Sequence, residues 1–221
     1  MPTVLITGAN RGIGLEFARQ YAGDGWDVIA TVRNLGSAEQ LNALGVRVEQ
    51  LDLNDLDAAA TFGERLGAPL DLLISNAGVM EPERAQTAAE GRAWGEMLTT
   101  NVIAPYLLAR SCLARIAAAR GKLVAISSGM GSIGESSGGY VPYRTSKAAL
   151  NMAWHSLAID AKRLGIVAAV FDPGWVKTRM GGQNAPLQPE DSVDDMRRLI
   201  ERLGPEHSGK FLKRDGSEHA W

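Results

Sequence analysis

The feature that most constrains the fold of this 221-residue chain is the regular order of short apolar runs, turns and helical stretches. Runs such as VLIT at residues 4–7 and LLIS at residues 72–75 are apolar almost throughout. Such strands are buried on both faces, and their alternation with helices is typical of a parallel sheet covered on both sides. We therefore predict an α/β fold built on one doubly wound parallel sheet of about seven strands, with helices on both faces.

The expected elements alternate along the whole chain. Strands are expected at residues 3–6, 26–32, 46–51, 70–74, 122–126, 166–171 and 208–213. Helices are expected at residues 13–21, 37–44, 55–66, 94–119, 143–164 and 190–203. No linker-like segment interrupts them, and the length suits one core, so residues 1–221 are predicted to form a single domain.

Composition and charge exclude several classes of partner. The formal net charge is −2 and the pI is near 6.0, so there is no basic field to hold nucleic acid or an anionic membrane. Cys112 is the only cysteine, which excludes an internal disulfide, and the histidines lack the spacing of metal ligands. There is no basic, apolar leader and no uninterrupted run of about 18 apolar residues. We expect a cytoplasmic protein without a metal, a nucleic-acid partner or a membrane span.

The turn between the first strand and the first helix reads TGANRGIG at residues 7–14. Glycines let the chain turn tightly and approach a bulky anion, and a helix N-terminus offers free N–H groups to a pyrophosphate. The spacing G-x-x-x-G-x-G differs from the common G-x-G-x-x-G, and a tight connection alone would explain it. Its place in an alternating chain favours a Rossmann-type dinucleotide site. The cofactor contacts expected here are Gly8, Asn10, Arg11, Gly12, Ile13 and Gly14.

The end of the second strand indicates which nicotinamide cofactor is used. NAD-dependent proteins of this fold usually carry an acidic residue there, about 20 residues past the glycines, which binds the ribose 2′-hydroxyl. Here residues 31–34 read TVRN, without an acid. Arg33, together with Arg11, offers charge-assisted hydrogen bonds to a 2′-phosphate instead. NADP(H) is therefore the expected cofactor, with NAD(H) as the alternative.

Seven short motifs follow one another along the chain. They are the turn at residues 7–14, Asp52-Leu53, SNAG at 75–78, Asn101, Ser127-Ser128, Tyr143-x-x-x-Lys147 and PGWVKT at 173–178. In these motifs and their order, the chain resembles the short-chain dehydrogenase/reductase family over nearly its whole length. The stretches ISSGMGSIGES, YRTSKAALNMA, DPGWVKTRMGG and SGKFLKRDG make it most similar to the small carbonyl reductases of the sniffer and C-factor type.

The resemblance implies a role for each of these residues. Tyr143 would be the catalytic acid/base, Lys147 its partner, Ser128 the group that polarises the carbonyl, and Asn101 the anchor of a water relay. Further residues would line the cofactor, namely Asp52, Leu53, Asn76, Ala77, Gly78, Pro173, Gly174, Val176 and Thr178, together with Tyr143 and Lys147. The loop and helix at about residues 180–205 would cover the substrate.

The pair Tyr143 and Lys147 suits hydride transfer to a carbonyl, because the negative charge that builds on oxygen must be stabilised and then protonated. A free tyrosine has a pKa of about 10, which a nearby cation lowers. Residues four apart on a helix share one face, so Lys147 can act on Tyr143. Ser128 precedes Tyr143 by 15 residues (143 − 128), a wider spacing than is usual in the family, so Ser127 and Ser132 remain alternatives.

We predict an NADP(H)-dependent oxidoreductase that interconverts a carbonyl and an alcohol on a small-molecule substrate. A second hypothesis is a C-factor-like signalling or regulatory protein that binds the cofactor with little catalysis. The complete set of Asn101, Ser128, Tyr143 and Lys147 speaks against it. Reduction of an enoyl C=C bond is a third hypothesis, disfavoured by the four-residue spacing of tyrosine and lysine. Relatives pair through the two long helices, so a homodimer or homotetramer is expected.

Overall fold

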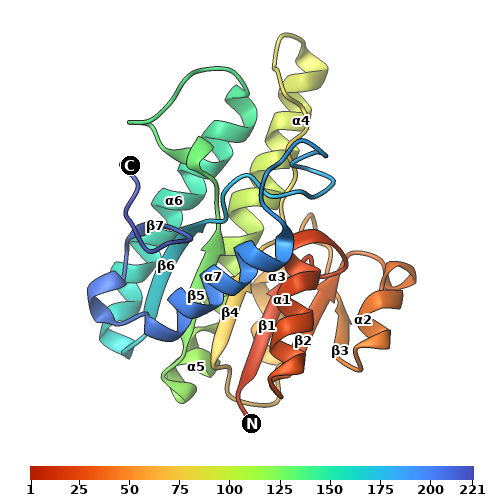
Figure 1. Cartoon of the computed structure of the whole chain (residues 1–221), viewed down its shortest axis with the longest axis vertical. Coiled ribbons are helices and arrows are strands. Elements are labelled where there is room, and N and C mark those ends of the chain that lie inside the picture. Colours follow the sequence, from red (N-terminus) through yellow and green to blue (C-terminus); the bar gives the residue numbers. More distant parts are fainter.

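The predicted strands form one wholly parallel, seven-stranded sheet in the computed structural model, which describes residues 1–221 (Figure 1). The strands are β1 (Thr3–Thr7), β2 (Asp27–Val32), β3 (Arg47–Gln50), β4 (Leu72–Ser75), β5 (Lys122–Ile126), β6 (Val167–Asp172) and β7 (Phe211–Lys213). Their order across the sheet is β3-β2-β1-β4-β5-β6-β7. The predicted α/β fold class with a doubly wound parallel sheet is confirmed.

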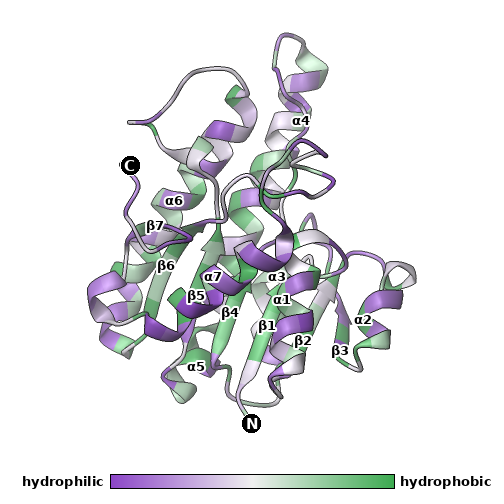
Figure 2. Ribbon diagram, in the orientation of Figure 1, coloured by the Kyte–Doolittle hydropathy of each residue, from purple (hydrophilic) through white to green (hydrophobic).

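Helices cover both faces of this sheet. One face carries α1 (Gly12–Gly23), α2 (Glu39–Ala43) and α7 (Pro189–Arg202), and the other carries α3 (Leu56–Thr61), α5 (Ala104–Ala119) and α6 (Val141–Ala161). Successive strand residues point to opposite faces, so Val4 and Ile6 join one hydrophobic core and Leu5 joins the other. Figure 2 shows the apolar strands between helices whose outer faces are polar. The uninterrupted apolar runs are explained by this burial on both sides.

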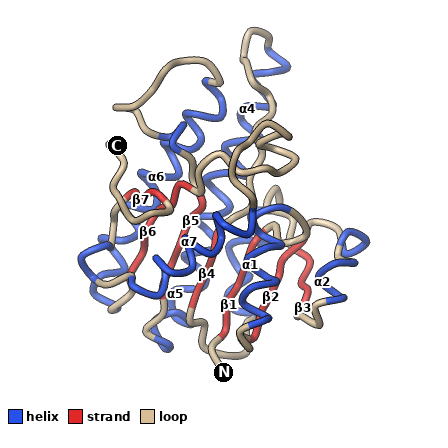
Figure 3. Tube along the Cα trace, viewed as in Figure 1, coloured by secondary structure: helices blue, strands red, loops and turns tan.

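The strand order reverses between β1 and β4, which are neighbours although they are far apart in the sequence. In open sheets of this kind, ligands bind outside the carboxyl ends of the strands at such a reversal. Figure 3 shows that the long loops gather above this end of the sheet. The glycine-rich turn and the segments after β3, β4, β5 and β6 belong to these loops, whereas Asn101 comes from a π-helical turn and Tyr143 and Lys147 from α6.

The longest helical region combines α4 (Ala88–Leu98), a π-helical turn η3 (Thr99–Ile103) and α5. It begins at Ala88 rather than at the predicted residue 94, because Thr87 and Glu90 form a capping box. The Thr87 hydroxyl accepts a hydrogen bond from the Glu90 backbone N–H, and the Glu90 carboxylate accepts one from the Thr87 backbone N–H. A capping box of this type satisfies the free N–H groups at a helix start.

By length and composition alone, the continuous helix Ala88–Ala119 could cross a membrane, whereas the sequence had suggested no such span. Core helices of soluble proteins meet the same criteria. In this fold 33% of its most apolar window is buried. Leu108, Cys112 and Ile116 of this helix lie in the hydrophobic core beneath the sheet.

Candidate active site

The turn before α1 is held by close approach of backbone atoms. Gly8 has a φ of +63°, and a Cβ placed on it would lie 2.9 Å from the Cα of Ala77. A Cβ on Gly14 would lie 2.5 Å from the carbonyl oxygen of Gly8 and from Nδ2 of Asn76. Only glycine fits these two positions, because both sites are closed by neighbouring atoms and the first also needs a left-handed conformation. The predicted glycine-rich turn therefore lies directly against the segment that follows β4.

Asn76 fastens this turn to β4. Its side-chain Nδ2 donates to the Thr7 carbonyl oxygen at 2.9 Å, and its backbone N–H donates to the Thr7 hydroxyl at 3.0 Å. The Ala77 N–H donates to the same hydroxyl at 3.0 Å. Asn76 and Ala77 thus organise the cofactor edge through the turn. Thr7, which the sequence analysis did not single out, is their shared acceptor.

The N-terminus of α1 is open for an anion. Arg11 is the N-cap residue, and its side chain makes no capping hydrogen bond. The first N–H groups of a helix then remain available, with a partial positive charge, to a pyrophosphate. Asn10 instead donates from Nδ2 to the hydroxyl of Ser37 at 3.0 Å, which ties this turn to the loop after β2. Ile13 and Gly14 continue into the first turn of the helix.

Three arginines converge beside this turn. Partial burial, then the charges of Arg179 and Arg33, lower the pKa of Arg11. None of the three forms an ion pair with a carboxylate of the chain. The sequence analysis did not identify Arg179. This residue directly follows Thr178, which lies beside the turn, since its Cγ2 would be 3.2 Å from a Cβ placed on Gly12. An unpaired cluster of guanidinium groups suits a phosphate.

The remaining predicted cofactor residues occupy the same edge. Asp52 accepts a hydrogen bond from the Asn54 N–H at 3.0 Å, and Leu53 is buried beside it. The Pro173 carbonyl accepts a 2.7 Å hydrogen bond from the hydroxyl of Ser192 on α7. Three further residues lie in the segment after β6, namely Gly174, with a φ of +79°, buried Val176, and Thr178, which accepts from the Gly181 N–H.

Tyr143 and Lys147 lie one turn apart on α6 and are both buried. The Lys147 Nζ is 5.7 Å from the centre of the Tyr143 ring. Burial raises the pKa of Tyr143 to about 12, helped by the Asp172 carboxylate and opposed by a hydrogen bond with Ser128. Burial also lowers the pKa of Lys147 to about 8. The sequence predicted that Lys147 would lower the pKa of Tyr143; instead the pKa is raised, because burial of the phenol dominates and Lys147 is not among the groups that shift it.

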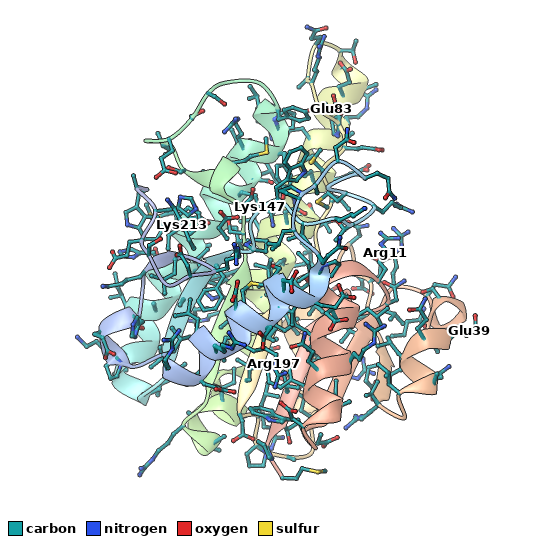
Figure 4. The ribbon with its side chains drawn as sticks, in the orientation of Figure 1. Arg11, Glu39, Glu83, Lys147, Arg197 and Lys213 are labelled. Carbon is teal, nitrogen blue, oxygen red and sulfur yellow. The ribbon has the colours of Figure 1, made fainter.

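The Lys147 ammonium has room for a further partner. Its Nζ donates one hydrogen bond, to the Ile126 carbonyl oxygen at 2.9 Å, and no other acceptor in the protein receives its remaining N–H groups. Gly78 leaves space next to it, since a Cβ there would lie 3.6 Å from Nζ. Figure 4 shows Lys147 above the carboxyl ends of the strands, at the same edge as Arg11. The chain thus leaves the free N–H groups that a ribose hydroxyl can use.

The three candidate serines have different surroundings. Ser127 donates to Oδ1 of Asn151 at 2.6 Å, and Ser132 donates to the Ala220 carbonyl oxygen at 2.7 Å. Both hydroxyls are therefore committed to contacts within the protein. Ser128 is half-buried, and its hydroxyl accepts from the Met130 N–H at 3.2 Å and interacts with the phenol of Tyr143. Among the three, Ser128 is the one whose hydroxyl donates no hydrogen bond to another group of the chain, and its carbonyl-polarising role stays a prediction.

Asn101 lies in the π-helical turn η3 and is buried. Its side chain accepts from the Val79 N–H at 2.8 Å, and donates to the Val79 carbonyl oxygen at 2.8 Å and to the Ser146 hydroxyl at 3.0 Å. These three bonds join the segment after β4 to α6. The side chain therefore positions the Gly78–Val79 backbone, and an anchoring role in a water relay stays a prediction.

The segment after β6 closes over the phenol. The Met180 Sδ lies 3.9 Å from the Tyr143 hydroxyl. Trp175 donates from Nε1 to the Gly181 carbonyl oxygen at 2.7 Å, and Lys177 donates from its backbone N–H to Leu187 at 2.8 Å. The predicted covering loop thus has one side chain in contact with the proposed acid.

Comparison with known proteins decides the family. The sequence model described as short chain dehydrogenase matches residues 2–188. The chain belongs to the short-chain dehydrogenase family. The matched range includes every cofactor and catalytic residue that the sequence predicted, since the last of these is Thr178.

Solved structures of other short-chain dehydrogenases share the whole fold. Carbonyl reductase Sniffer of D. melanogaster has a TM-score of 0.92 and 32% identity, with all of both chains covered. The NADPH-bound carbonyl reductase from chicken fatty liver has a TM-score of 0.87 and 35% identity, covering 100% of this chain and 99% of that one. The C-signal protein of Myxococcus xanthus is 39% identical over 155 residues, which are 69% of this chain and 93% of that protein. The predicted resemblance to this subgroup is confirmed.

Proposed function

We propose that this short-chain dehydrogenase is an NADP(H)-dependent oxidoreductase that interconverts a carbonyl and an alcohol, with Tyr143 as the acid/base. One observation carries the proposal. A buried phenol and a buried ammonium lie 5.7 Å apart, ring centre to Nζ, at the edge of the sheet that also holds the glycine-rich turn. Burying two ionisable side chains costs stability, which points to a chemical role.

The residues around the turn fit a phosphorylated dinucleotide. The α1 N-terminus would hold its pyrophosphate, Lys147 and Gly78 its ribose, and Arg11, Arg33 and Arg179 a 2′-phosphate. When bound, a nicotinamide cofactor supplies or accepts the hydride. The NADPH in the chicken carbonyl reductase supports the choice of cofactor.

The chain's own side chains would handle the proton. Because the pKa of Tyr143 is raised to about 12, the phenol keeps its proton at neutral pH and can donate it to the oxygen of a carbonyl that is being reduced. The Ser128 hydroxyl would donate a second hydrogen bond to that oxygen. Lys147 would favour the phenolate that remains, since its ammonium is charged below a pH of about 8.

A cofactor-and-substrate screen tests this function. Oxidation of NADPH and NADH is followed at 340 nm with panels of aldehydes, ketones and diketones. We expect faster turnover with NADPH, and we expect Arg33→Ala and Arg179→Ala to weaken NADPH about tenfold more than NADH. Equal losses with both cofactors would contradict the phosphate assignment, and no turnover with any carbonyl would contradict the enzyme assignment.

The similarity to the C-signal protein supports one alternative, a regulatory protein that binds the cofactor with little catalysis. Cofactor binding alone cannot separate the two functions, whereas turnover can. Tight NADPH binding without oxidation by any carbonyl in the panel would favour the regulatory function. The buried Tyr143 and Lys147 favour the enzyme, because a binding module has no use for the phenol.

We also propose pairing of two copies through α5 and α6. Ile103 at the end of η3, directly before α5, and Met152 and Ile159 on α6 are exposed apolar side chains, at 43%, 63% and 64%. Met152 and Ile159 are seven residues apart and lie on one face of α6, and contiguous exposed apolar surface is typical of an interface. Light scattering coupled to gel filtration is expected to give a multiple of 23.6 kDa. Replacement of Met152 and Ile159 by glutamate is expected to shift the mass towards one chain.

A further inference from the structure

The C-terminal tail lies on the loop that follows β5. The Ala220 carbonyl oxygen accepts from the Ser132 hydroxyl at 2.7 Å, and the Trp221 carbonyl oxygen accepts from the Gly134 N–H at 2.8 Å. The Trp221 ring lies 5.9 Å from the Phe211 ring, centre to centre. Figure 1 shows the C-terminus beside the loop that joins β5 to α6. This loop begins at Ser128 and leads into the helix that carries Tyr143.

His219 is the polar centre of this contact. Its Nδ1 lies 2.8 Å from Oε2 of Glu135 in the loop, and its Nε2 lies 2.9 Å from Oδ2 of Asp172 at the end of β6. The side chain is 6% exposed and stacks on the Phe211 ring, with the centres 4.5 Å apart. The loop backbone fits closely, since a Cβ on Gly129 would lie 3.3 Å from the imidazole. The imidazole therefore bridges two segments of the active site.

The two contacts define the chemical form of the ring. An ionised carboxylate only accepts hydrogen bonds, so each ring nitrogen must donate one. Both nitrogens of histidine carry a proton only in the imidazolium. The hydrogen bond from His219 lowers the pKa of Glu135, which keeps that carboxylate ionised. Two carboxylates at these distances favour the imidazolium form, which donates to both.

Asp172 connects this bridge to the proposed acid. Its carboxylate raises the pKa of Tyr143, in addition to the larger effect of burial. A positive charge on the other side of Asp172 opposes that influence. Asp172 also accepts a hydrogen bond from the Gly174 N–H at 3.1 Å, at the start of the covering segment.

We propose that His219 is a positioning residue of the active site, which ties the Ser128 loop to the end of β6 and offsets the charge of Asp172 beside Tyr143. The proposal rests on the proposed function, because its kinetic consequence requires Tyr143 to be the acid/base. Four charged or titratable groups face the bridge. They are Glu135 from the loop, Asp172 from β6, Lys213 from β7, whose charge also lowers the pKa of Glu135, and Tyr143 from α6 beyond Asp172.

Two substitutions separate the two parts of the proposal, which are the attachment of the loop to the end of β6 (the tether) and the positive charge beside Asp172. His219→Phe keeps an aromatic ring on Phe211 but removes both hydrogen bonds and the charge. His219→Gln keeps an amide N–H donor for one of the two carboxylates, without the charge. Lys210→Gln is the matched control, because Lys210 pairs with Glu218 of the same tail and forms no hydrogen bond or ion pair with His219.

The first measurement is hydrogen exchange of the backbone amides at residues 129–139, which does not depend on activity. We expect faster exchange in His219→Phe, a smaller increase in His219→Gln, and wild-type exchange in Lys210→Gln. Unchanged exchange in His219→Phe would contradict the tether. If the Phe variant does not fold, the Gln variant decides through the second measurement.

The second measurement is the pH profile of kcat for alcohol oxidation, in which Tyr143 must accept a proton. We expect the rise of kcat to move to higher pH in His219→Phe and His219→Gln, because Asp172 then acts on Tyr143 unopposed. Asp172→Asn combined with either change is expected to return the profile. An unmoved profile in an active His219→Gln would overturn the charge role. If the wild type turns over no alcohol or carbonyl, the proposed function fails, and the exchange measurement still decides the tether.

Discussion

The turn between β1 and α1 is shaped by backbone atoms, whereas the surroundings of Tyr143 are shaped by side chains from distant segments. At the turn, Gly8 and Gly14 lie where a single added carbon would overlap the chain. Around the phenol, Met180, Ser128 and Asp172 come from three different loops or strand ends. The cofactor edge, which is formed by this turn, thus depends on glycines that no larger residue can replace. The catalytic edge, which surrounds Tyr143, depends on where the ends of side chains from different segments meet.

The two regions also differ in the free energy that it costs to remove their ionisable side chains from water. Arg11, Arg33 and Arg179 are exposed, so water solvates them until a phosphate binds. Lys147 and Tyr143 are buried, and desolvation moves the pKa of each away from its usual value. We infer that the catalytic edge is the part of the molecule that trades stability for function.

Replacement of Gly14 is expected to have the largest effect on the turn. Replacement of Gly14 by alanine places a Cβ 2.5 Å from the Gly8 carbonyl oxygen, so the turn must shift. We expect NADPH binding to weaken about a hundredfold and the free energy of unfolding to fall by about 3 kcal/mol. Fluorescence titration and thermal melting measure the two effects. Gly23→Ala on the same helix is the control, because nothing lies within 4 Å of its Cβ; loss of binding there too would remove the backbone argument.

Lys147→Met tests whether the catalytic edge costs stability. The pKa of Lys147 is about 8 in the folded chain against 10.5 without burial, so the unfolded chain binds more protons between these values. Wild-type stability therefore rises with pH across this window, and the cost of the buried ammonium is complete below pH 8. We expect the methionine variant to be more stable by up to about 3 kcal/mol at pH 7, and to lose most activity.

The advantage of the methionine variant should shrink as the pH rises from 8 towards 10.5. Loss of the hydrogen bond to the Ile126 carbonyl oxygen opposes the gain at every pH. Denaturant unfolding at pH 7, 9 and 10 measures this. A variant less stable than the wild type at pH 7, with a difference independent of pH, would show that the ammonium carries no desolvation cost.

The adjacent serines Ser127 and Ser128 test whether the two hydroxyls serve stability or catalysis. Ser128→Ala is expected to lower kcat about a hundredfold with little change in melting temperature, because the proposed function places its hydroxyl at the reacting oxygen. Ser127→Ala is expected to do the reverse, costing about 1–3 kcal/mol of stability, since it leaves Oδ1 of buried Asn151 without its 2.6 Å hydrogen bond. Steady-state kinetics and melting of both variants decide. A larger kcat loss in Ser127→Ala would move the assignment to that serine.

The smallest expected effect concerns the covering segment. Trp175→Phe removes the 2.7 Å hydrogen bond to the Gly181 carbonyl oxygen and leaves the ring in place. We expect KM for the substrate to rise about threefold and kcat to change little, because an exposed hydrogen bond contributes about 0.5–1.5 kcal/mol. A fall in kcat without a change in KM would instead connect this segment to the chemical step.

The fold class and the glycine-rich turn could be predicted from the sequence, because buried strands and tight turns each leave a pattern in neighbouring residues. The tyrosine–lysine spacing likewise follows a local rule, whereas the order of the strands was not predicted and depends on pairing between distant segments. Arg179 and His219 could not be found in this way. The role proposed for Arg179 depends on its position near Arg11, and the role proposed for His219 depends on its contacts with Glu135 and Asp172. These partners lie far away in the sequence. The raised pKa of Tyr143 was missed for the same reason, since burial is a property of the assembled core.

The most direct test of the account compares wild type with Tyr143→Phe at saturating NADPH and a reactive carbonyl. The variant lacks only the phenol oxygen, so its fold and its NADPH affinity should be preserved. We predict that kcat falls by about a thousandfold. A variant that binds NADPH normally and retains kcat within a few-fold of the wild type would contradict the role of Tyr143 as proton donor.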